Sequence, residues 1–280
     1  MSLSGKALMK RELRCKDKPL IMGVLNVTPD SFFDGGRFFD VDKAVEHALR
    51  MVEEGADIID VGGESTRPYS EPVPADEELK RVLPVISGIR ARSDILISVD
   101  TYKAKTARAA HDAGADMIND ISGLTFDRDM AGTVGDLGAY VVIVHIKGTP
   151  GNMQEAPFYD DVISEIKDFF VGRVRFAKDR GIKEDDIILD PGIGFGKRVE
   201  DNLKILKMLG TFKDMGRPVL AGASMKSFIG TVTEATMEER IDGTLASIAI
   251  SLWNGADIVR VHDVERAHRV LNLVHAVRGS

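Results

Sequence analysis

The chain has 280 residues, a formal net charge of −7, and 44% hydrophobic against 29% charged residues. These values are ordinary for a globular protein with a sizeable core, and the length suits one large domain or two small ones. The negative charge argues against a nucleic-acid partner, because proteins that bind phosphate backbones usually carry a basic face.

The first 18 residues are polar and lack the apolar stretch of a secretory signal. No apolar run approaches the about 20 residues that a membrane-spanning helix needs. The single cysteine, Cys15, permits no disulfide within the chain, which suits a reducing compartment. We therefore expect a cytoplasmic protein that contacts neither membranes nor nucleic acids.

Short stretches rich in valine and isoleucine alternate along the chain with longer stretches of helical period. The short stretches are almost continuously apolar, which predicts parallel strands that are covered on both faces. The expected strands are residues 20–27, 57–62, 95–100, 117–121, 140–146, 187–191, 218–223 and 258–262. The expected helices are residues 41–54, 76–89, 160–177, 199–209, 244–253 and 265–277.

Two local signals support these helices. Val41, Val45 and Val52 share one apolar stripe of the first helix, and Asp76 is expected to cap the second. The tripeptide Gly-Ala-Asp recurs at residues 55–57, 114–116 and 255–257, each time between a helix and a strand. Glycine suits the left-handed conformation that ends a helix, so the recurrence indicates a repeated helix-to-strand unit.

Eight strands alternating with helices favour an α/β fold of the (β/α)8 type, a TIM barrel, over an open doubly wound sheet. The open sheet usually carries a glycine-rich loop after its first strand, where this chain has Asn26, Val27, Thr28 and then proline. No linker rich in proline or serine divides the chain. We predict a single barrel domain over residues 19–280, preceded by an extension over residues 1–18.

Polar side chains end every expected strand, which is where such barrels place their working residues. One set, suited to a flat, nitrogen-rich ring, comprises Asp100, Asn119, Asp190 and Lys226. A second set, suited to phosphate, comprises Asn26, Ser65, Thr66, Arg67, Arg260 and His262. Asn26 could also bind Mg²⁺, which commonly combines few protein ligands with substrate phosphates. A single polar strand end is often structural, but so many on one rim indicate a site for a ring that carries a diphosphate.

Two features have simpler interpretations than chemistry. Residues 192–197, Gly-Ile-Gly-Phe-Gly-Lys, lack the spacing of a dinucleotide or phosphate loop. They more simply permit a close turn after Asp190, with Phe195 available for stacking. His145 has no neighbouring residues at metal-ligand spacing, so a hydrogen-bonding or core histidine is favoured.

Taken in order, these segments resemble the dihydropteroate synthase family. The resemblance is carried by residues 21–32 and 34–36, 61–68 (VGGESTRP), 98–103, 118–120, 145 with 148–150, 189–197 (LDPGIGFGK), 226–227 and 260–263. It extends from about residue 19 to residue 277. Eight linked motifs at compatible spacing are far more specific than any one of them.

The resemblance implies an enzyme that joins 6-hydroxymethyl-7,8-dihydropterin pyrophosphate to p-aminobenzoate, works with Mg²⁺, forms a homodimer and is a target of sulfonamides. It implies that the pterin is bound by Asp100, Asn119, Asp190, Lys226 and Arg260. It implies that pyrophosphate is bound by Asn26, Thr66, Arg67, Arg260 and His262, with Asn26 as metal ligand. It implies that p-aminobenzoate is bound by Phe32, Ser65, Thr66, Pro68, Phe195 and Ser227. The implied catalytic residues are Asp34, Lys226 and Arg260.

Two residues depart from the family's pattern. Met225 stands where the family usually has arginine, and Phe33 where it commonly has serine. Met225 removes a cation beside the substrate sites, which favours one alternative, a non-catalytic pterin-binding homologue. A second alternative, a methyltetrahydrofolate methyltransferase, has less need of the anion site. A third, a phosphate-binding aldolase, would need a Schiff-base lysine at a strand end, which is not evident here.

Overall fold

The computed structural model describes residues 10–15, 18–28 and 40–280. Its strands are β1 (Leu20–Asn26), β2 (Ile58–Gly62), β3 (Leu96–Asp100), β4 (Met117–Asp120), β5 (Tyr140–Val144), β6 (Ile187–Asp190), β7 (Leu220–Ala221) and β8 (Ile258–Val261). Its α-helices are α1 (Val41–Glu53), α2 (Ala75–Arg90), α3 (Ala104–Asp112), α4 (Met130–Leu137), α5 (Val162–Asp179), α6 (Val199–Lys207), α7 (Ser227–Thr233), α8 (Arg240–Trp253) and α9 (Val264–Arg278). Two short 3-10 helices, Glu184–Asp186 and Leu209–Met215, precede β6 and β7.

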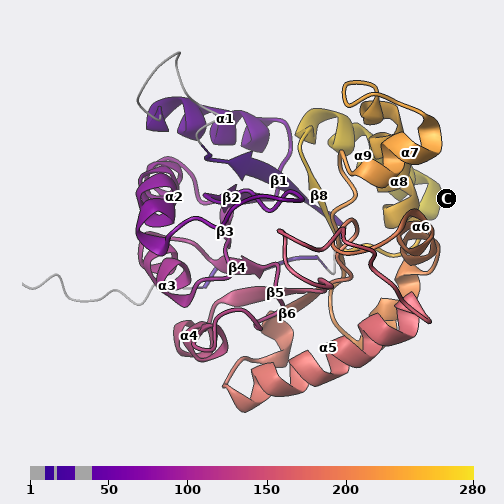
Figure 1. Ribbon diagram of the computed structural model, residues 1–280. Helices are drawn as coiled ribbons and strands as arrows, with labels where there is room; N and C mark the ends of the chain where they lie inside the picture. The colour runs from indigo at the N-terminus through magenta and orange to yellow at the C-terminus, as the bar shows by residue number, and fades with distance from the viewer. Residues whose placement is uncertain (1–9, 16–17, 29–39) are drawn as a thin grey trace, which may run out of the picture.

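The strands form one parallel sheet in the order β6-β5-β4-β3-β2-β1-β8-β7. A bridge between Leu189 and Val219 joins the two ends, and the Leu189 N–H donates to the Pro218 carbonyl at 2.9 Å. The sheet is therefore closed into a barrel, and Figure 1 shows the helices as a ring around it. The predicted (β/α)8 TIM barrel is confirmed.

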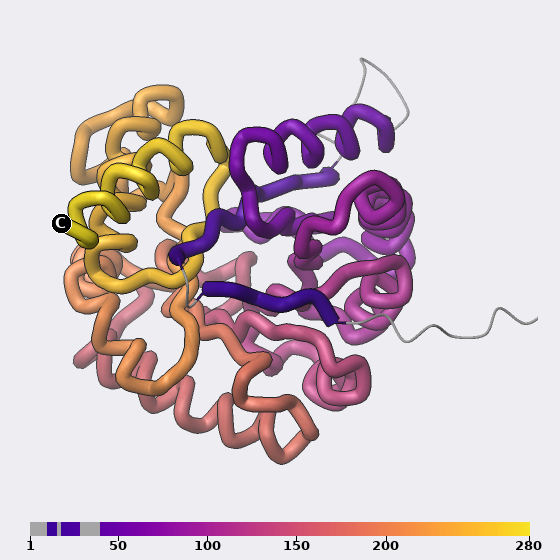
Figure 2. The backbone as a smooth tube through the Cα atoms, turned by 180° about the vertical axis from the view of Figure 1, so that it is seen from behind, coloured from indigo at the N-terminus to yellow at the C-terminus, as the bar shows by residue number. Residues whose placement is uncertain are grey.

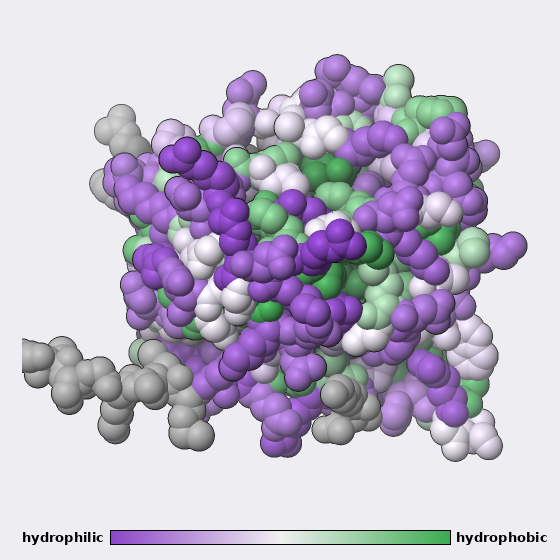
Figure 3. Space-filling view, turned by 90° about the horizontal axis from the view of Figure 1, so that it is seen from below, coloured by the Kyte–Doolittle hydropathy of each residue, from purple (hydrophilic) through white to green (hydrophobic). Residues whose placement is uncertain are grey.

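Side chains along each strand alternate between the helices and the barrel interior. In β1, Ile21 and Leu25 belong to the large core between strands and helices, whereas Leu20 and Met22 belong to a smaller core inside the barrel. Each fully buried aliphatic side chain contributes about 1.5–3 kcal/mol to stability. Both faces being buried explains why the strand sequences are continuously apolar. On the outside, Figure 3 shows one side of the barrel on which hydrophilic residues prevail and apolar ones form small patches.

Residues 10–15 cross the amino-terminal end of the barrel, as the view from behind in Figure 2 shows. Leu13 and Cys15 pack against the interior core. The Tyr140 hydroxyl accepts from the Leu13 N–H at 3.2 Å and donates to the Arg11 carbonyl at 3.1 Å. Part of the predicted extension thus covers this end, which leaves the carboxyl ends of the strands for a site.

The repeated Gly-Ala-Asp has two structural functions. Gly55, Gly114 and Gly255 have φ of 105°, 115° and 101°, as the predicted left-handed turn requires. The aspartates of the repeat, to which the sequence analysis assigned no function, bind the backbone of a neighbouring strand or of the residue before it. The carboxylates of Asp57, Asp116 and Asp257 accept from the N–H groups of Ile21, Ile97 and Val219 at 2.9, 3.0 and 2.8 Å. Each repeat therefore ties one strand to its neighbour at the start of the barrel.

The helix predictions need three corrections. Asp76 does not cap α2: the helix begins at Ala75 after Pro74, whose carbonyl accepts the first helical bonds, and no side chain caps it. Three short helices, α3, α4 and α7, were not assigned residues, because they lack a long apolar stripe and α4 contains glycines. Helix α8 begins at Arg240 instead of residue 244. Within the described ranges, no helix is long and apolar enough to span a membrane.

Candidate functional site

The register of the parallel strands brings several predicted site residues to one level at the mouth of the barrel. Asn26 pairs with Gly62, Gly62 with Asp100, and Asp100 with Asn119. Gly62 keeps this wall open, because a Cβ there would lie 3.7 Å from Asn26 Oδ1 and 3.8 Å from Asp100 Oδ2. The mouth is therefore lined by polar groups of consecutive strands with free space between them.

Arg260 is at the centre of this polar cluster. Its Nε donates to Asp60 Oδ2 at 2.6 Å, and its NH2 group donates to Asp100 Oδ2 at 2.8 Å. Asn119 Nδ2 also donates to Asp60 Oδ2, at 3.0 Å. Such charge-assisted pairs in a buried environment fix the guanidinium plane firmly.

Asp60 is a residue that the sequence analysis missed. Its side chain is fully buried, and among the described residues Asp60 Oδ1 and Asn119 Oδ1 have no hydrogen-bond partner. Buried oxygens of this kind are usually bound by a ligand or by water. The signal was available, since Asp60 precedes Gly62 by two residues and so faces the interior on the same side of β2.

Asp190 and Lys226 face the cluster from the other side of the mouth. Asp190 Oδ1 accepts from the Gly192 N–H at 2.7 Å, and Lys226 Nζ lies 3.9 Å from the centroid of the Phe195 ring. Gly194, with φ of 84°, lies against the lysine stem, where a Cβ would come within 2.8 Å of Lys226 Cδ. The glycine-rich segment is thus a close turn, as predicted, and the Phe195 ring lies against the Lys226 ammonium group.

The ionisable groups of the mouth have pKa values shifted toward neutrality. Burial raises the pKa of Asp100 to about 7 although Arg260 acts in the opposite direction, and burial raises the pKa of Asp190 to about 6. Burial, followed by the charge of Arg260, lowers the pKa of Lys226 to about 8. Shifts of this kind on several groups in one hollow are typical of functional sites.

The predicted anion-binding residues lie at the edge of the same mouth. His262 Nδ1 is 2.9 Å from Ser224 Oγ. Burial lowers the pKa of His262 to about 4, and the charges of Arg260, Lys226 and Arg67 act in the same direction. The imidazole is therefore neutral near pH 7, and the positive charge available to an anion resides on the arginines and Lys226.

The remaining predicted residues lie on the loops that follow the strands. Ser65 and Thr66 are half-buried, and Arg67 and Pro68 are exposed, in the loop between β2 and α2. Ser227, at the start of α7, is exposed. Phe32 and Asp34, as well as the departure at Phe33, lie outside the described residues. The structure brings the ring-binding set and Arg260 together, while the assigned roles stay predictions.

His145 forms a buried pair with Lys197, a second residue without a predicted role. Lys197 is 3% exposed, and its Nζ lies 3.0 Å from His145 Nδ1 and donates to the Phe195 carbonyl at 3.0 Å. Burial, followed by the charge of Lys197, lowers the pKa of His145 to about 2. The neutral ring therefore accepts from the lysine, in line with the hydrogen-bonding interpretation. Of the residues that the structure describes, no three His, Cys, Asp or Glu side chains cluster as a metal site would require.

Met225, the departure beside Lys226, has a left-handed backbone with φ of 59°. Its N–H donates to Thr244 Oγ1 at 3.1 Å, and its sulfur lies 3.7 Å from the same oxygen. The side chain thus contacts α8, and its position supplies no charge to the mouth.

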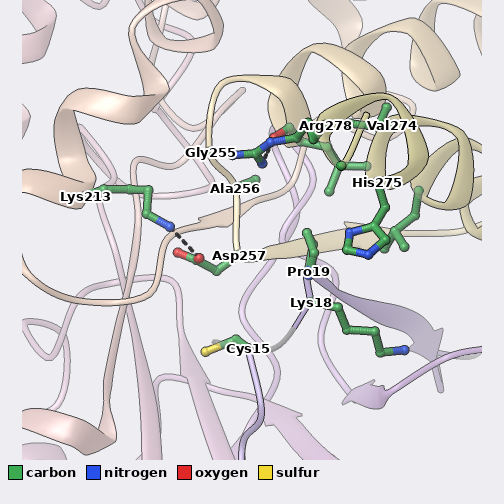
Figure 4. A pocket seen from close by; sticks show the side chains of 13 residues that line it. Cys15, Lys18, Pro19, Lys213, Gly255, Ala256, Asp257, Val274, His275 and Arg278 are labelled. Carbon is green, nitrogen blue, oxygen red and sulfur yellow. Dashed lines mark hydrogen bonds and ion pairs between the residues drawn. The ribbon is translucent and has the colours of Figure 1, made fainter.

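A separate hollow of about 320 Å³ lies at the opposite end of the barrel, lined by Lys18, Pro19, Lys213 and Arg278 among others (Figure 4). Lys213 there pairs with Asp257 at 2.6 Å. The mouth, in contrast, holds buried oxygens without a partner among the described residues, and ionisable groups with shifted pKa values. The mouth is the better candidate.

Comparison with known proteins gives consistent matches. The model of the family described as pterin binding enzyme matches residues 22–262. The dihydropteroate synthase of Synechocystis sp. is 45% identical over 258 residues, which cover 92% of this chain and 89% of the relative. That of Bacillus subtilis is 45% identical over 265 residues, covering 95% and 90%.

Solved structures agree with these relatives. The Yersinia pestis dihydropteroate synthase, in a complex with a sulfonamide drug, matches with a TM-score of 0.91 and 39% identity over the full length of both chains. The Xanthomonas albilineans enzyme in complex with 7,8-dihydropteroate matches with a TM-score of 0.87 and 42% identity, covering 96% of each chain.

Proposed function

Because this chain belongs to the pterin-binding enzyme family, and within it to the dihydropteroate synthases, we propose that its barrel mouth joins 6-hydroxymethyl-7,8-dihydropterin pyrophosphate to p-aminobenzoate. The products are 7,8-dihydropteroate and pyrophosphate. The observation that carries the proposal is the convergence of the ring-binding set on Arg260, with unpartnered oxygens on Asp60 and Asn119.

The pterin binds between the two sides of the mouth. Asp190 keeps one carboxylate oxygen beyond its bond to Gly192, and this oxygen accepts from the amidine-like edge of the ring. Lys226 donates to the ring carbonyl. The guanidinium of Arg260, held by two carboxylates, packs along the face of the ring.

The pyrophosphate binds at the edge of the mouth. Arg67 and Arg260 supply positive charge, and the neutral ring of His262 donates one hydrogen bond. Thr66, half-buried in the loop after β2, adds a hydroxyl. Donors preorganised for charge that develops on the leaving group are the main electrostatic contribution of such a site.

The donor set also fits Mg²⁺. Asn26 has its oxygen on the wall beside Gly62, and no cluster of three His, Cys, Asp or Glu side chains surrounds it in the described part of the chain. This fits an ion held by one protein ligand together with substrate phosphates and water. When bound, Mg²⁺ would supply positive charge that offsets the charge of the departing pyrophosphate.

In the proposed reaction, pyrophosphate leaves before the p-aminobenzoate nitrogen attacks. The bond between the pterin methylene carbon and the bridging oxygen breaks first, and pyrophosphate takes the electron pair. The electron-rich pterin stabilises the resulting cation, and Asp34 is proposed to assist it. The p-aminobenzoate nitrogen then attacks the methylene carbon and loses a proton. Loops closed over the mouth exclude water, which would otherwise capture the cation.

Two further properties follow the family. We propose a homodimer whose contacts include Trp253 of α8, because this side chain is 57% exposed, with Ile250 one turn earlier exposed as well. Leu252 and Leu271, in contrast, are buried in the core of the barrel. We place the enzyme in the cytoplasm, which suits its single cysteine.

The test is product formation with omission controls. Dihydropteroate is expected only when the pterin pyrophosphate, p-aminobenzoate and Mg²⁺ are all present, and each omission should abolish it. Calorimetric binding of the pterin without any product would instead identify a non-catalytic homologue. In that case Met225→Arg would show whether the missing cation is the cause.

A further inference from the structure

A network of buried charges lies beneath the loop that follows β2. Glu64, 7% exposed, is the last buried residue before the half-buried Ser65 and Thr66 and the exposed Arg67. Its partners are Tyr102 and Lys103, which follow β3. None of these three residues has a role in the proposed chemistry, although all three belong to motifs that carry the family resemblance.

The Glu64 carboxylate, at the start of the loop, binds the backbone at the end of the loop. Its Oε2 accepts from the Val73 N–H at 2.9 Å, so one side chain holds both ends of residues 64–73. Its Oε1 accepts from the Tyr102 hydroxyl at 2.7 Å, and burial together with this hydrogen bond raises the pKa of that hydroxyl. A carboxylate that accepts several buried donors is held in one orientation.

Lys103 joins the loop to α2. Its ammonium group donates to Glu64 Oε2 at 2.5 Å and to Glu78 Oε2 at 2.7 Å, and Glu78 is fully buried. Gly63 permits this approach, because a Cβ there would lie 2.8 Å from Val82 Cγ1 and 3.0 Å from Glu78 Cγ. One ammonium group thus compensates two buried carboxylates that would otherwise repel each other.

Among the described residues, few other contacts fix the position of the loop. Ser70 Oγ donates to the Ser65 carbonyl at 2.6 Å, within the loop, and the Tyr69 N–H donates to the Pro150 carbonyl at 3.0 Å, in the segment that follows β5. Arg67, Pro68 and Tyr69 are exposed, with Tyr69 at 67%. Since little apolar surface is buried here, the position of the loop depends on the charged network at its base.

We propose that Glu64, Tyr102 and Lys103 are positioning residues that hold this loop over the mouth. In this role they place Ser65, Thr66 and Arg67 toward p-aminobenzoate and the leaving group. The same strand end that provides Asp100 to the ring-binding set provides the loop's anchor two and three residues later. The inference rests on the proposed function for what the loop binds, but not for how the loop is held.

The experiment compares Lys103→Met with Arg90→Met. Arg90 is a matched control, because it also pairs with a buried carboxylate, Asp116 at 2.7 Å, with side-chain exposures of 13% and 7%, at the opposite end of the barrel. The first readout needs no substrate: chymotrypsin cleavage after the exposed Tyr69, identified by fragment mass. The second is the KM for p-aminobenzoate, with the dissociation constant of the pterin measured beside it.

Lys103→Met is expected to speed cleavage after Tyr69 by about tenfold, because a loop released from its anchor opens more often. We expect the KM for p-aminobenzoate to rise about 10- to 100-fold through misplacement of the loop. Pterin affinity should stay within about threefold, because neither Lys103 nor its partners belong to the ring-binding set. A tenfold change would correspond to about 1.4 kcal/mol. Lys103→Arg should restore both readouts, and Arg90→Met should change neither.

The proposal would be overturned if Lys103→Met were cleaved after Tyr69 at the rate of the unmodified protein and had the same KM for p-aminobenzoate. The network would then have a purely structural role. If Lys103→Met does not fold, Glu64→Gln serves in its place, because it keeps a similar shape and an acceptor but loses the charge that pairs with Lys103. Absence of product from the unmodified protein would count against the proposed function alone, since the cleavage comparison would still decide whether the network holds the loop.

Discussion

Replacing Arg260 with methionine is expected to abolish measurable synthesis and to lower the free energy of unfolding by about 3–5 kcal/mol. Its guanidinium donates to Asp60 at 2.6 Å and to Asp100 at 2.8 Å. Without it, two carboxylates remain buried in the same interior without their counter-charge. The pterin would also lose the planar cation along its ring. Urea unfolding and the product assay measure the two effects separately.

Arg260→Lys is the control for charge. It keeps the positive charge but loses the planar fork of the guanidinium, which bonds Asp60 through Nε and Asp100 through its NH2 group. We expect stability between that of the unmodified protein and that of Arg260→Met, with activity still strongly reduced. Arg260→Met with kcat/KM within tenfold of the unmodified protein would show that the cluster is structural and remote from the chemistry.

Replacing Lys226 with methionine is expected to lower kcat/KM for the pterin substrate about 100-fold, since a hydrogen bond from a charged donor contributes about 1.5–3 kcal/mol. The pH profile gives a sharper signature. Lys226 has a pKa of about 8, so its donating, charged form is present below pH 8 and is lost as the pH rises. In the unmodified protein kcat/KM should therefore fall above about pH 8, and this decline should be absent in Lys226→Met.

The acid side of the same profile is an internal control. Asp100 and Asp190, with pKa values of about 7 and about 6, lose their negative charge as the pH falls, and one oxygen of each then becomes a donor instead of a charged acceptor. The decline below neutral pH should therefore persist in Lys226→Met. An alkaline decline near pH 8 that survives the substitution would assign it to another group, and Lys226 would lose its proposed role.

The sequence predicted the barrel and the positions of most polar groups at its mouth for a physical reason. Parallel strands buried on both faces have a recognisable composition, and their carboxyl ends meet at one rim. Asn26, Asp100 and Asn119 were therefore found without knowledge of the contacts between them. Helices with a long apolar stripe, such as α1 and α5, were found for a similar reason.

The misses share a cause as well. Asp60 lies inside an apolar strand, two residues before the strand ends at Gly62. Only the packing of the interior shows that it pairs with Arg260, 200 positions later. Lys103 and Glu64 are 39 positions apart, and neither residue type reveals its partner. Long-range pairing of charges is a property of the folded chain, whereas strand ends and helix stripes are encoded locally.

A structure with 7,8-dihydropteroate bound tests the central claim most directly. We expect the pterin ring at the mouth of the barrel, with hydrogen bonds to Asp190 and Lys226 and its face against Arg260. The p-aminobenzoate part should extend toward Thr66 and Phe195. The ligand found instead in the hollow beside Lys213 and Arg278, with the mouth unoccupied, would contradict the account.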